Sequence, residues 1–411
     1  MSNDKPDIEV DIETAPDRGE SIGMMEPMVI GDTARARGEL TDLALEIAQR
    51  AAGFRKSLPD GVMHALADLV RAMNCYYSNL IEGHDTHPID IERALKDDYS
   101  ADPEKRDLQL EAKAHIAVQE WIDHGGLDGR AFTADGIREV HRRFCDLLPE
   151  DLLVLTIEST GEKVPVIPGE YRTRDVEVGR HVPVSPGAVP RFMTRFEQVY
   201  TKLGRTDTIL AAATAHHRLA WIHPFIDGNG RVMRLMSYAV LREALHTGGV
   251  WSIARGLARN VDDYKRHLAA CDLERRNDLD GRGHLSEEAL AAFAAFFLQV
   301  CIDQVKFMEE LVRPDRLRNR ILLWAEEEIR MDALPPKADR ILEAVLYRGV
   351  LPREDVPDLV GTQRRQATRI VSSLIERGVL KSETSRAPLY LTFPATLASR
   401  WMSGLFPEKP A

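Results

Sequence analysis

The sequence predicts a mainly helical protein with one β-hairpin near its middle and a small helix-turn-helix domain with a hairpin wing at its C-terminal end. Three observations support this prediction. Apolar residues recur at three- and four-residue spacing through most of the chain, which indicates amphipathic helices. Apolar and polar residues alternate around a glycine between 176 and 184, which indicates a hairpin. After Pro335 and Pro336, three short helical patterns precede two short alternating stretches, an order that resembles a winged helix-turn-helix domain.

The composition indicates a folded protein without a membrane span. A length of 411 residues suggests two or three domains, and a hydrophobic content of 44% can supply a core, which excludes wholesale disorder. No uninterrupted run of ~18 apolar residues occurs, and the first residues are acidic where a signal peptide is basic. The four cysteines lack CxxC spacing and are expected to be reduced thiols in a cytoplasmic protein. The net charge of −11 disfavours global affinity for nucleic acid.

Residue patterning divides the chain into five consecutive parts. The first is acidic, contains three prolines and lacks sustained periodicity, so we expect a flexible leader. The boundaries place a leader at 1–33, an N-terminal helical region at 34–100, a helical core at 101–312, a connecting helix at 313–334 and the C-terminal domain at 335–411. In the second part, one buried helical face is marked by Leu66, Leu69, Val70, Met73 and Tyr77.

The predicted hairpin lies inside the helical core. Val176 and Val178 alternate with polar residues before Gly179, and Val182 and Val184 alternate after it. The neighbouring prolines, Pro183 and Pro186, suit an edge strand because proline cannot donate a ladder hydrogen bond.

The C-terminal domain is predicted to contain helices over 338–347, 354–360 and 363–377, followed by two short strands within 379–393. On the third helix, an apolar stripe faces inward and three arginines point outward: Arg364, Arg365 and Arg369. These arginines are suited to DNA phosphates or a groove edge, yet such domains also dock proteins, and nearby glutamates dilute the basic face. DNA and protein both stay open as partners of this domain.

The densest chemical signal is the string HPFIDGNGRVMR at 223–234. The helical patterns over 209–222 and 231–245 flank it, and its proline and two glycines break the first helix before the second begins. A glycine-rich turn that opens a helix presents free amide groups, and glycines let a phosphate approach the backbone. The sequence therefore predicts a phosphate-binding turn between two helices.

The side chains of this string suit transfer from a nucleotide. Asn229 can donate a hydrogen bond to a phosphate oxygen, and Arg231 and Arg234 lie about one helical turn apart, so they can reach successive phosphates. Asp227 beside the turn suits Mg²⁺, which prefers carboxylate and phosphate oxygens. His223 precedes the turn, and a histidine titrates near neutrality, as a general base requires.

This string resembles the signature of the Fic family, HPFx(D/E)GNGRxxR, at every specified position. The resemblance covers about 65–300 and implies a Fic-type helical bundle with a β-hairpin flap over the site. The predicted hairpin and the preceding Gly169–Arg172 look like that flap. Fic enzymes typically move AMP from ATP to a Ser, Thr or Tyr hydroxyl of a target protein. The kinase-like Doc branch departs from this signature at the second glycine and the last arginine, whereas Gly230 and Arg234 are both present here.

The resemblance also implies roles for individual residues. The resemblance implies that His223 is the general base and that Asp227 is a Mg²⁺ ligand. It implies that the phosphates are cradled by a loop of Gly228, Asn229 and Gly230. It also implies that Arg231 contacts the leaving pyrophosphate and that Arg234 binds the γ-phosphate. The flap is expected to receive an extended segment of the target protein by strand addition.

A second motif lies upstream, at Ser78-Asn79-Leu80-Ile81-Glu82-Gly83, and resembles the family's inhibitory signature (S/T)xxxE(G/N). A helix that ends there next to the site would pair the Glu82 carboxylate with Arg234 and occupy the guanidinium that the γ-phosphate needs. The alternative is a helix that ends at a C′ glycine with Glu82 solvated. The signature assigns regulation to Ser78, Glu82 and Gly83.

Three further residues carry weaker signals. His216 and His217 lie on the helix before His223 without HExxH spacing, so we expect ordinary helix residues and not zinc ligands. Tyr264 resembles a Fic segment near the adenine, and a core aromatic is an equally good interpretation.

Taken together, the sequence favours an ATP- and Mg²⁺-dependent protein adenylyltransferase that is restrained by Glu82. The resemblance leaves self-modification and a homodimer open. Two alternatives come from other classes: a hydrolase that removes AMP from a modified protein, with Glu82 positioning water, and a DNA-binding regulator whose Fic core senses a nucleotide.

Overall fold

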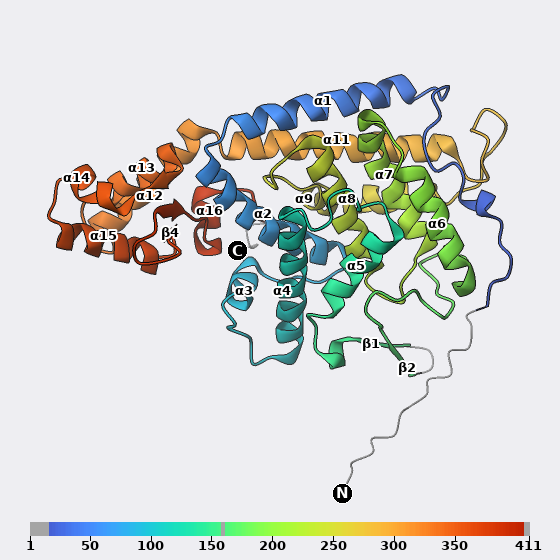
Figure 1. Cartoon of the computed structure of the whole chain (residues 1–411), viewed down its shortest axis with the longest axis horizontal. Coiled ribbons are helices and arrows are strands. Elements are labelled where there is room, and N and C mark those ends of the chain that lie inside the picture. The colour runs from blue at the N-terminus through green and yellow to red at the C-terminus, as the bar shows by residue number, and fades with distance from the viewer. Residues whose placement is uncertain (1–15, 158–160, 407–411) are drawn as a thin grey trace, which may run out of the picture.

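A computed structural model describes residues 16–157 and 161–406, and Figure 1 presents it as a helical body from which a smaller group of helices extends to one side. The mainly helical fold class predicted from the sequence is confirmed. The helices of the body are α1 (Arg37–Lys56), α2 (Asp60–Ile81), α3 (Pro88–Ala94), α4 (Pro103–Asp123), α5 (Ala134–Cys145), α6 (Val189–Tyr200), α7 (Arg205–Ile222), α8 (Asn229–Leu245), α9 (Ala254–Arg259), α10 (Val261–Ala270) and α11 (Glu287–Leu311).

Local capping chemistry explains where several of these helices begin. The Thr133 side chain accepts a hydrogen bond from the Gly136 amide at the start of α5, and Ser286 does the same for Ala289 at the start of α11. Asp102 caps α4, and the proline that follows it occupies the first helical position, where a missing amide hydrogen costs nothing. These boundaries therefore follow from neighbouring residues in the sequence.

The core of the body is built around α7, α8 and α11. The helices α7 and α8 pack against each other, and α11 packs against α7 on one side and α1 on the other (Figure 1). By composition α11 is long and apolar enough to cross a membrane, with a mean hydropathy of 1.5, but 61% of that apolar window is buried inside the protein. Packing against α1 and α7 accounts for its apolar character. The helix α2 lies between α4 and α9 and reaches the same core.

The described part of the predicted leader, residues 16–33, contacts the helical body. A 3₁₀ helix spans Ile22–Met25, and Met25, Met28 and Ile30 are buried. The Tyr200 hydroxyl donates a hydrogen bond to the Met28 carbonyl. A few apolar residues are enough to dock the segment, although they are too few to produce a periodic signal. Residues 1–15 lie outside the described residues.

The predicted hairpin over 176–184 is reduced to a single antiparallel bridge between Val178 and His181. Pro183 has no amide hydrogen to extend the pairing, and the Val184 carbonyl is bound by an arginine side chain instead. Regular strand pairing occurs earlier in the chain. The strands β1 (Val154–Thr156) and β2 (Lys163–Pro165) are antiparallel, with Leu155 opposite Val164.

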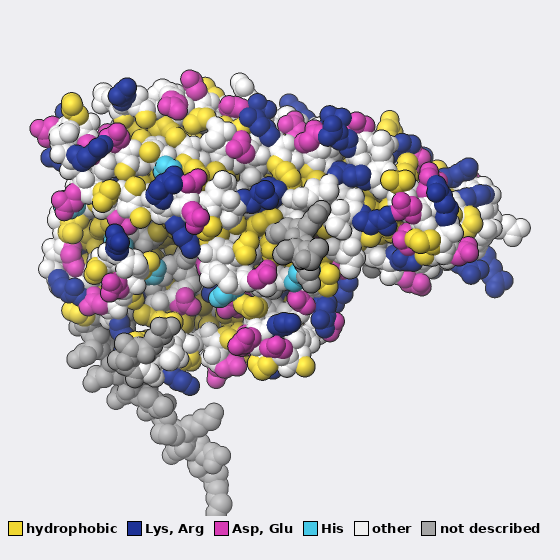
Figure 2. Space-filling view, turned by 180° about the vertical axis from the view of Figure 1, so that it is seen from behind, with side chains coloured by type: hydrophobic (Ala, Val, Ile, Leu, Met, Phe, Trp, Pro, Cys, Tyr) yellow, Lys and Arg dark blue, Asp and Glu magenta, His cyan; other side chains and the backbone are white. Residues whose placement is uncertain are grey.

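The C-terminal part begins with α12 (Pro314–Arg330). It continues with α13 (Ala338–Arg348), β3 (Val350–Leu351), a 3₁₀ turn (Arg353–Asp355), α14 (Val356–Val360), α15 (Arg364–Glu376), β4 (Leu380–Lys381) and β5 (Leu389–Leu391). The sheet order is β3-β5-β4, with both pairings antiparallel, so β3 is a strand that the sequence did not suggest. The arginines of the predicted outer face of α15 are exposed. Figure 2 shows Lys and Arg interspersed with Asp and Glu over this end of the molecule.

The chain beyond β5 leaves the small sheet and returns to the body, which the predicted domain boundary did not include. A 3₁₀ turn (Ala395–Leu397) contacts α3, and α16 (Ala398–Trp401) packs on α12. The ring of Trp401 meets that of Trp324 edge-on, with centroids 5.1 Å apart. Residues 402–406 then reach α2, the helix that ends next to the Gly-rich loop.

Candidate functional site

The loop between α7 and α8 holds its two ends in left-handed backbone conformations. His223 caps α7 with φ 50° and ψ 63°, and Gly228 caps α8 with φ 78°. Left-handed backbone is uncommon for a residue with a side chain, so His223 is held there by its surroundings. The start of α8 has no side-chain cap, so the amide groups of its first turn face the loop as an anion site. The predicted turn between two helices is present.

The Asn229 side chain was expected to bind a phosphate oxygen, but in the structure it bonds to the backbone of its own loop. Its side-chain oxygen accepts a hydrogen bond from the Phe225 amide (3.0 Å), and its nitrogen donates one to the Phe225 carbonyl (2.8 Å). The side chain is buried and closes the loop on itself. Any contact of Asn229 with a phosphate therefore falls to its backbone amide, and its side chain sets the loop shape.

His223 lies largely buried at the base of this loop. Burial, together with the positive charge of Arg172 and a smaller contribution from His181, lowers the pKa of His223 to about 4. This shift is away from the titration near neutrality that the sequence suggested. The imidazole is therefore neutral at pH 7, the form in which one ring nitrogen can accept a proton.

Asp227 is exposed beside the start of α8, and its Oδ1 accepts a hydrogen bond from the Gly228 amide at 2.6 Å. Across residues 16–157 and 161–406, no three His, Cys, Asp or Glu side chains gather as a metal site. Mg²⁺ is usually bound through one or two carboxylates plus substrate phosphates. A single accessible carboxylate next to an anion site therefore fits a Mg²⁺ ion that arrives with a phosphorylated substrate.

Glu82 reaches this site from α2. The helix ends in a Schellman motif: the Gly83 amide donates to the Leu80 carbonyl (3.1 Å), and the His84 amide donates to the Asn79 carbonyl (3.0 Å). Gly83 has φ 90°, so the inhibitory signature supplies a glycine where a left-handed residue is needed. This motif fixes Glu82 at the end of α2, facing α8.

The Glu82 carboxylate pairs with both arginines of the loop motif. Its Oε1 accepts a hydrogen bond from Arg234 Nη2, and its Oε2 lies 3.3 Å from Arg231 Nε. Arg234 also donates from Nε to the Ser78 hydroxyl at 2.8 Å. Burial alone would raise the pKa of Glu82, but the charges of Arg234 and Arg231 lower it below its usual value. The carboxylate is therefore ionised and paired, whereas the alternative interpretation expected it to be solvated.

Residues 131–241 match the family model described as Fic/DOC family. The chain contains a Fic/DOC family domain. It is 40% identical over 102 residues to "Protein adenylyltransferase Fic" of Drosophila yakuba, covering 24% of this chain and 20% of that protein. It is 30% identical over 171 residues to the protein of the same name in Drosophila grimshawi, covering 41% and 32%. The chain thus spans between a fifth and a third of the length of these curated relatives.

A solved structure extends the likeness beyond this segment. The crystal structure of a Fic family protein from Desulfovibrio desulfuricans G20 aligns with a TM-score of 0.52 and 17% identity, covering 89% of this chain and 98% of that one. At this identity the likeness concerns the fold alone. At 89% of the chain, the likeness extends well beyond residues 131–241.

A second carboxylate reaches the loop motif from outside the matched residues 131–241, and no sequence pattern indicated it. Glu111 of α4 places Oε2 3.4 Å from Arg231 Nη1, and burial raises the pKa of this carboxyl although Arg231 opposes the rise. Arg231 also lies over the ring of Phe144, 4.8 Å from its centroid. One turn along α4, His115 is buried, and burial lowers its pKa to about 3, so it adds no charge. Arg231 is therefore held from two sides.

His141 supports the Fic loop from α5 and was also missed. Its ring stacks on Phe225 with centroids 4.0 Å apart, and its Nδ1 accepts a hydrogen bond from the Gly169 amide at 2.8 Å. A Cβ on Gly228 would lie 3.5 Å from this ring. The ring therefore joins the segment before the flap to the phosphate loop. A lone histidine on an apolar helix face carries no motif, so sequence reasoning could not identify it.

The remaining sequence candidates are buried in the core of the helical body. His216 bonds to the Ser237 hydroxyl (2.8 Å) and the Tyr264 hydroxyl (2.7 Å), and His217 bonds to Asp272 (3.0 Å). Both are satisfied core histidines, as expected. Tyr264 is 2% exposed, so it is a core aromatic in this state.

Proposed function

We propose that this chain is a protein adenylyltransferase, which transfers AMP from ATP to a hydroxyl side chain of a protein, and that Glu82 restrains it. One observation carries the proposal: a single loop and helix place the neutral imidazole of His223, the carboxylate of Asp227, the uncapped start of α8 and Arg234 around one site. Residues 131–241, which match the Fic/DOC family model, include this unit, and the similarity of the chain to relatives named "Protein adenylyltransferase Fic" supports the same reaction class.

In the proposed reaction, the amide groups of the first turn of α8 bind the phosphates of ATP, and Arg231 and Arg234 neutralise their charge. His223 accepts the proton of the target hydroxyl. The hydroxyl oxygen bonds to the α-phosphorus, the bond from that phosphorus to the bridging oxygen breaks, and pyrophosphate leaves with the electron pair. Asp227 would hold Mg²⁺, which supplies neutralising charge to the phosphates when bound. The product is a phosphodiester between AMP and the target side chain.

In the state described here, Glu82 competes with ATP for the same two guanidinium groups. A Cβ on Gly230 would lie only 2.7 Å from Glu82 Oε1, so the carboxylate fills the space directly over the first turn of α8. A γ-phosphate can take Arg234 only if this carboxylate withdraws. The proposal therefore combines an assembled phosphate site with an internal anion that occupies part of it.

The test is to supply ATP labelled at the α- or the γ-phosphate to the purified chain with cell lysate, for wild type and for Glu82→Gly. We expect protein labelling from α-labelled ATP and none from γ-labelled ATP. Labelling from the γ position alone would indicate phosphorylation. Absence of transfer from either position in both proteins would overturn the proposed function.

A further inference from the structure

One buried arginine joins the flap segment, residues 172–184, to the loop that carries His223. Arg172 is 3% exposed, and its Nε donates a hydrogen bond to the His223 carbonyl at 2.8 Å. Its Nη2 lies 3.5 Å from the Ile222 carbonyl, and its backbone amide donates to the Pro224 carbonyl at 2.9 Å. Arg172 thus contacts the backbone carbonyl group of the left-handed residue His223 and the carbonyl groups of the residues on either side of it.

The other edge of the guanidinium holds the flap. Arg172 Nη1 donates to the Arg174 carbonyl at 3.0 Å, and Nη2 donates to the Val184 carbonyl. No ion pair forms between Arg172 and a carboxylate in the described parts of the chain. Burial lowers the pKa of Arg172 to about 10, so it is still charged at pH 7. Backbone carbonyl groups accept the hydrogen bonds of this guanidinium, and the Asp175 and Glu20 carboxylates act on its charge without a direct ion pair. A planar fork with several donors is what such a cluster needs.

We infer that Arg172 is a positioning residue for His223: it fixes the imidazole and the flap in one arrangement, so that a hydroxyl presented by the flap meets the base. This inference rests on the proposed function. His223 is in an unfavourable backbone conformation, and removal of its carbonyl partner lets it relax. A displacement of about 1 Å at a reacting group can cost about 100-fold in rate.

The test compares Arg172→Gln and Arg172→Lys in the Glu82→Gly chain. We expect Arg172→Gln to lower kcat about 10- to 100-fold while the KM for ATP changes less than about threefold, because Arg172 holds the base and the flap and not the phosphates. Arg172→Lys keeps the charge but loses the fork, so its kcat is expected to fall in between. The lysine variant also tests the positioning role if the glutamine variant does not fold.

Arg218 provides a matched control, because it is also buried and also binds a backbone carbonyl, that of Pro27, at 3.0 Å from Nε and 2.7 Å from Nη2. Arg218→Gln is expected to lower the melting temperature while kcat per folded molecule is retained. An equal loss of kcat in both variants, or no loss in Arg172→Gln, would overturn the positioning role. A crystal structure of Arg172→Gln tests the positioning role without an activity measurement, so it applies even if the parent transfers no AMP. The role would be overturned if His223 kept a φ near 50° and the Val178–His181 bridge stayed intact.

A second inference comes from the C-terminal segment 402–406, which packs on α2. The Tyr77 hydroxyl donates a hydrogen bond to the Leu405 carbonyl at 2.8 Å, and the ring of Tyr76 meets that of Phe406 edge-on, with centroids 5.7 Å apart. Leu405 is fully buried, and Arg255 of α9 donates to the Gly404 carbonyl at 2.8 Å. This segment is thus held against the turn of α2 that immediately precedes Ser78.

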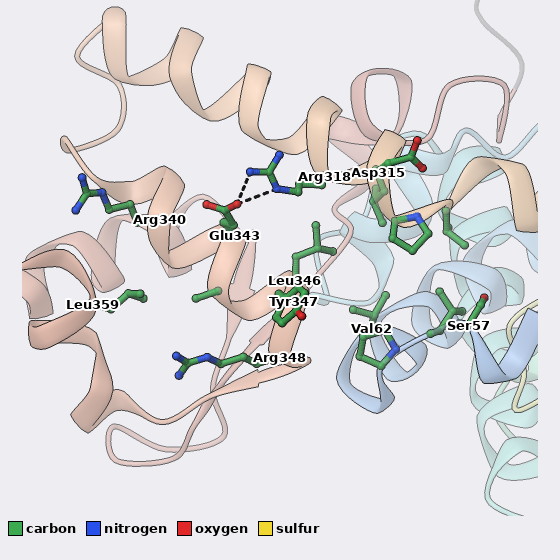
Figure 3. A pocket seen from close by; sticks show the side chains of 16 residues that line it. Ser57, Val62, Asp315, Arg318, Arg340, Glu343, Leu346, Tyr347, Arg348 and Leu359 are labelled. Atoms are coloured by element: carbon green, nitrogen blue, oxygen red, sulfur yellow. Dashed lines mark hydrogen bonds and ion pairs between the residues drawn. The ribbon is translucent and has the colours of Figure 1, made fainter.

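The C-terminal part also contacts the earlier turns of α2. Lys381 of β4 pairs with Asp68 at 2.7 Å, and a Cβ on Gly61 would lie only 1.8 Å from the Gly349 carbonyl, so the two backbones touch. Beside this contact, a cavity of about 780 Å³ separates α13 from the turn before α2; Figure 3 shows Tyr347 and Leu346 on one side of it and Val62 on the other. The helix that ends at Glu82 is therefore contacted along its length, with open space next to its first turn.

We propose that segment 402–406 holds α2 in the restrained position, so that displacement of this segment frees Glu82 from Arg234. This also rests on the proposed function. Glu82 can leave the arginines only if the last turns of α2 shift or unwind, and Tyr76 and Tyr77 tie those turns to the segment. The C-terminal part is thereby a regulatory input to the Fic site.

The test uses Phe406→Ala and Tyr77→Phe, each alone and combined with Glu82→Gly. We expect each single variant to raise AMP transfer about 3- to 10-fold, the effect of losing one aromatic contact or one hydrogen bond, and to have no effect once Glu82 is absent. Amide hydrogen exchange across 76–84 is expected to become faster in Phe406→Ala.

Arg400→Ala is the matched control, because Arg400 of α16 pairs with Glu327 of α12 and not with α2. It is expected to leave AMP transfer unchanged. Unchanged transfer and exchange in Phe406→Ala would overturn the proposal, and so would an equal increase in the Glu82→Gly background. If Glu82→Gly itself transfers no AMP, the proposed function fails, and hydrogen exchange still decides whether the segment holds α2.

Discussion

Replacing Glu82 with glycine is expected to raise AMP transfer about 10- to 100-fold, which corresponds to ~1.4–2.8 kcal/mol. The carboxylate is paired with Arg234 and Arg231, and close charge pairs of this kind couple by ~1.5 kcal/mol or more. Without it, both guanidinium groups are available to the phosphates, and the space over Gly230 opens. The measurement is the initial rate of labelling from α-labelled ATP, at low and at saturating ATP.

The control for shape is Glu82→Gln, which keeps the side chain but removes its charge. It is expected to gain most of the activation if electrostatic competition dominates, and little if the side chain acts mainly as a steric block. ATP is also expected to raise the melting temperature of Glu82→Gly more than that of wild type, because the freed arginines bind its phosphates. A glycine variant that is no more active than wild type would show that Glu82 does not restrain transfer.

The sequence predicted the central loop well because its chemistry is local. Pro224, Gly228 and Gly230 interrupt two strong helical patterns, so the turn and the start of α8 follow from neighbouring residues alone. The end of α2 was predictable for the same reason, since Gly83 ends the helix right after Glu82. Only the structure shows that Glu82 pairs with Arg231 as well as with Arg234. Residue spacing in the sequence does not distinguish one partner from two.

The residues that were missed act across the fold and not along the chain. Glu111 and His141 come from α4 and α5 and meet the loop only after the helices pack, and neither sits in a recognisable pattern. Alternation around Gly179 suggested a longer hairpin than the single bridge observed, because pairing is decided by available amide groups and not by apolar spacing. The hydrophobic periodicity also did not indicate that the chain returns to α2 after β5.

Replacing His223 with alanine in the Glu82→Gly chain is expected to lower AMP transfer about 10²- to 10⁴-fold, the usual cost of removing a general base. ATP affinity, measured by calorimetry, is expected to change less than about threefold, because the start of α8 and the arginines bind the phosphates without the imidazole. His124→Ala is the control, since His124 is exposed at the end of α4 and bonds only to its own helix. Transfer by His223→Ala within about tenfold of its parent would contradict the base assignment. Lost ATP binding in this variant would instead place the imidazole among the phosphate ligands, and the roles of the loop would have to be reassigned.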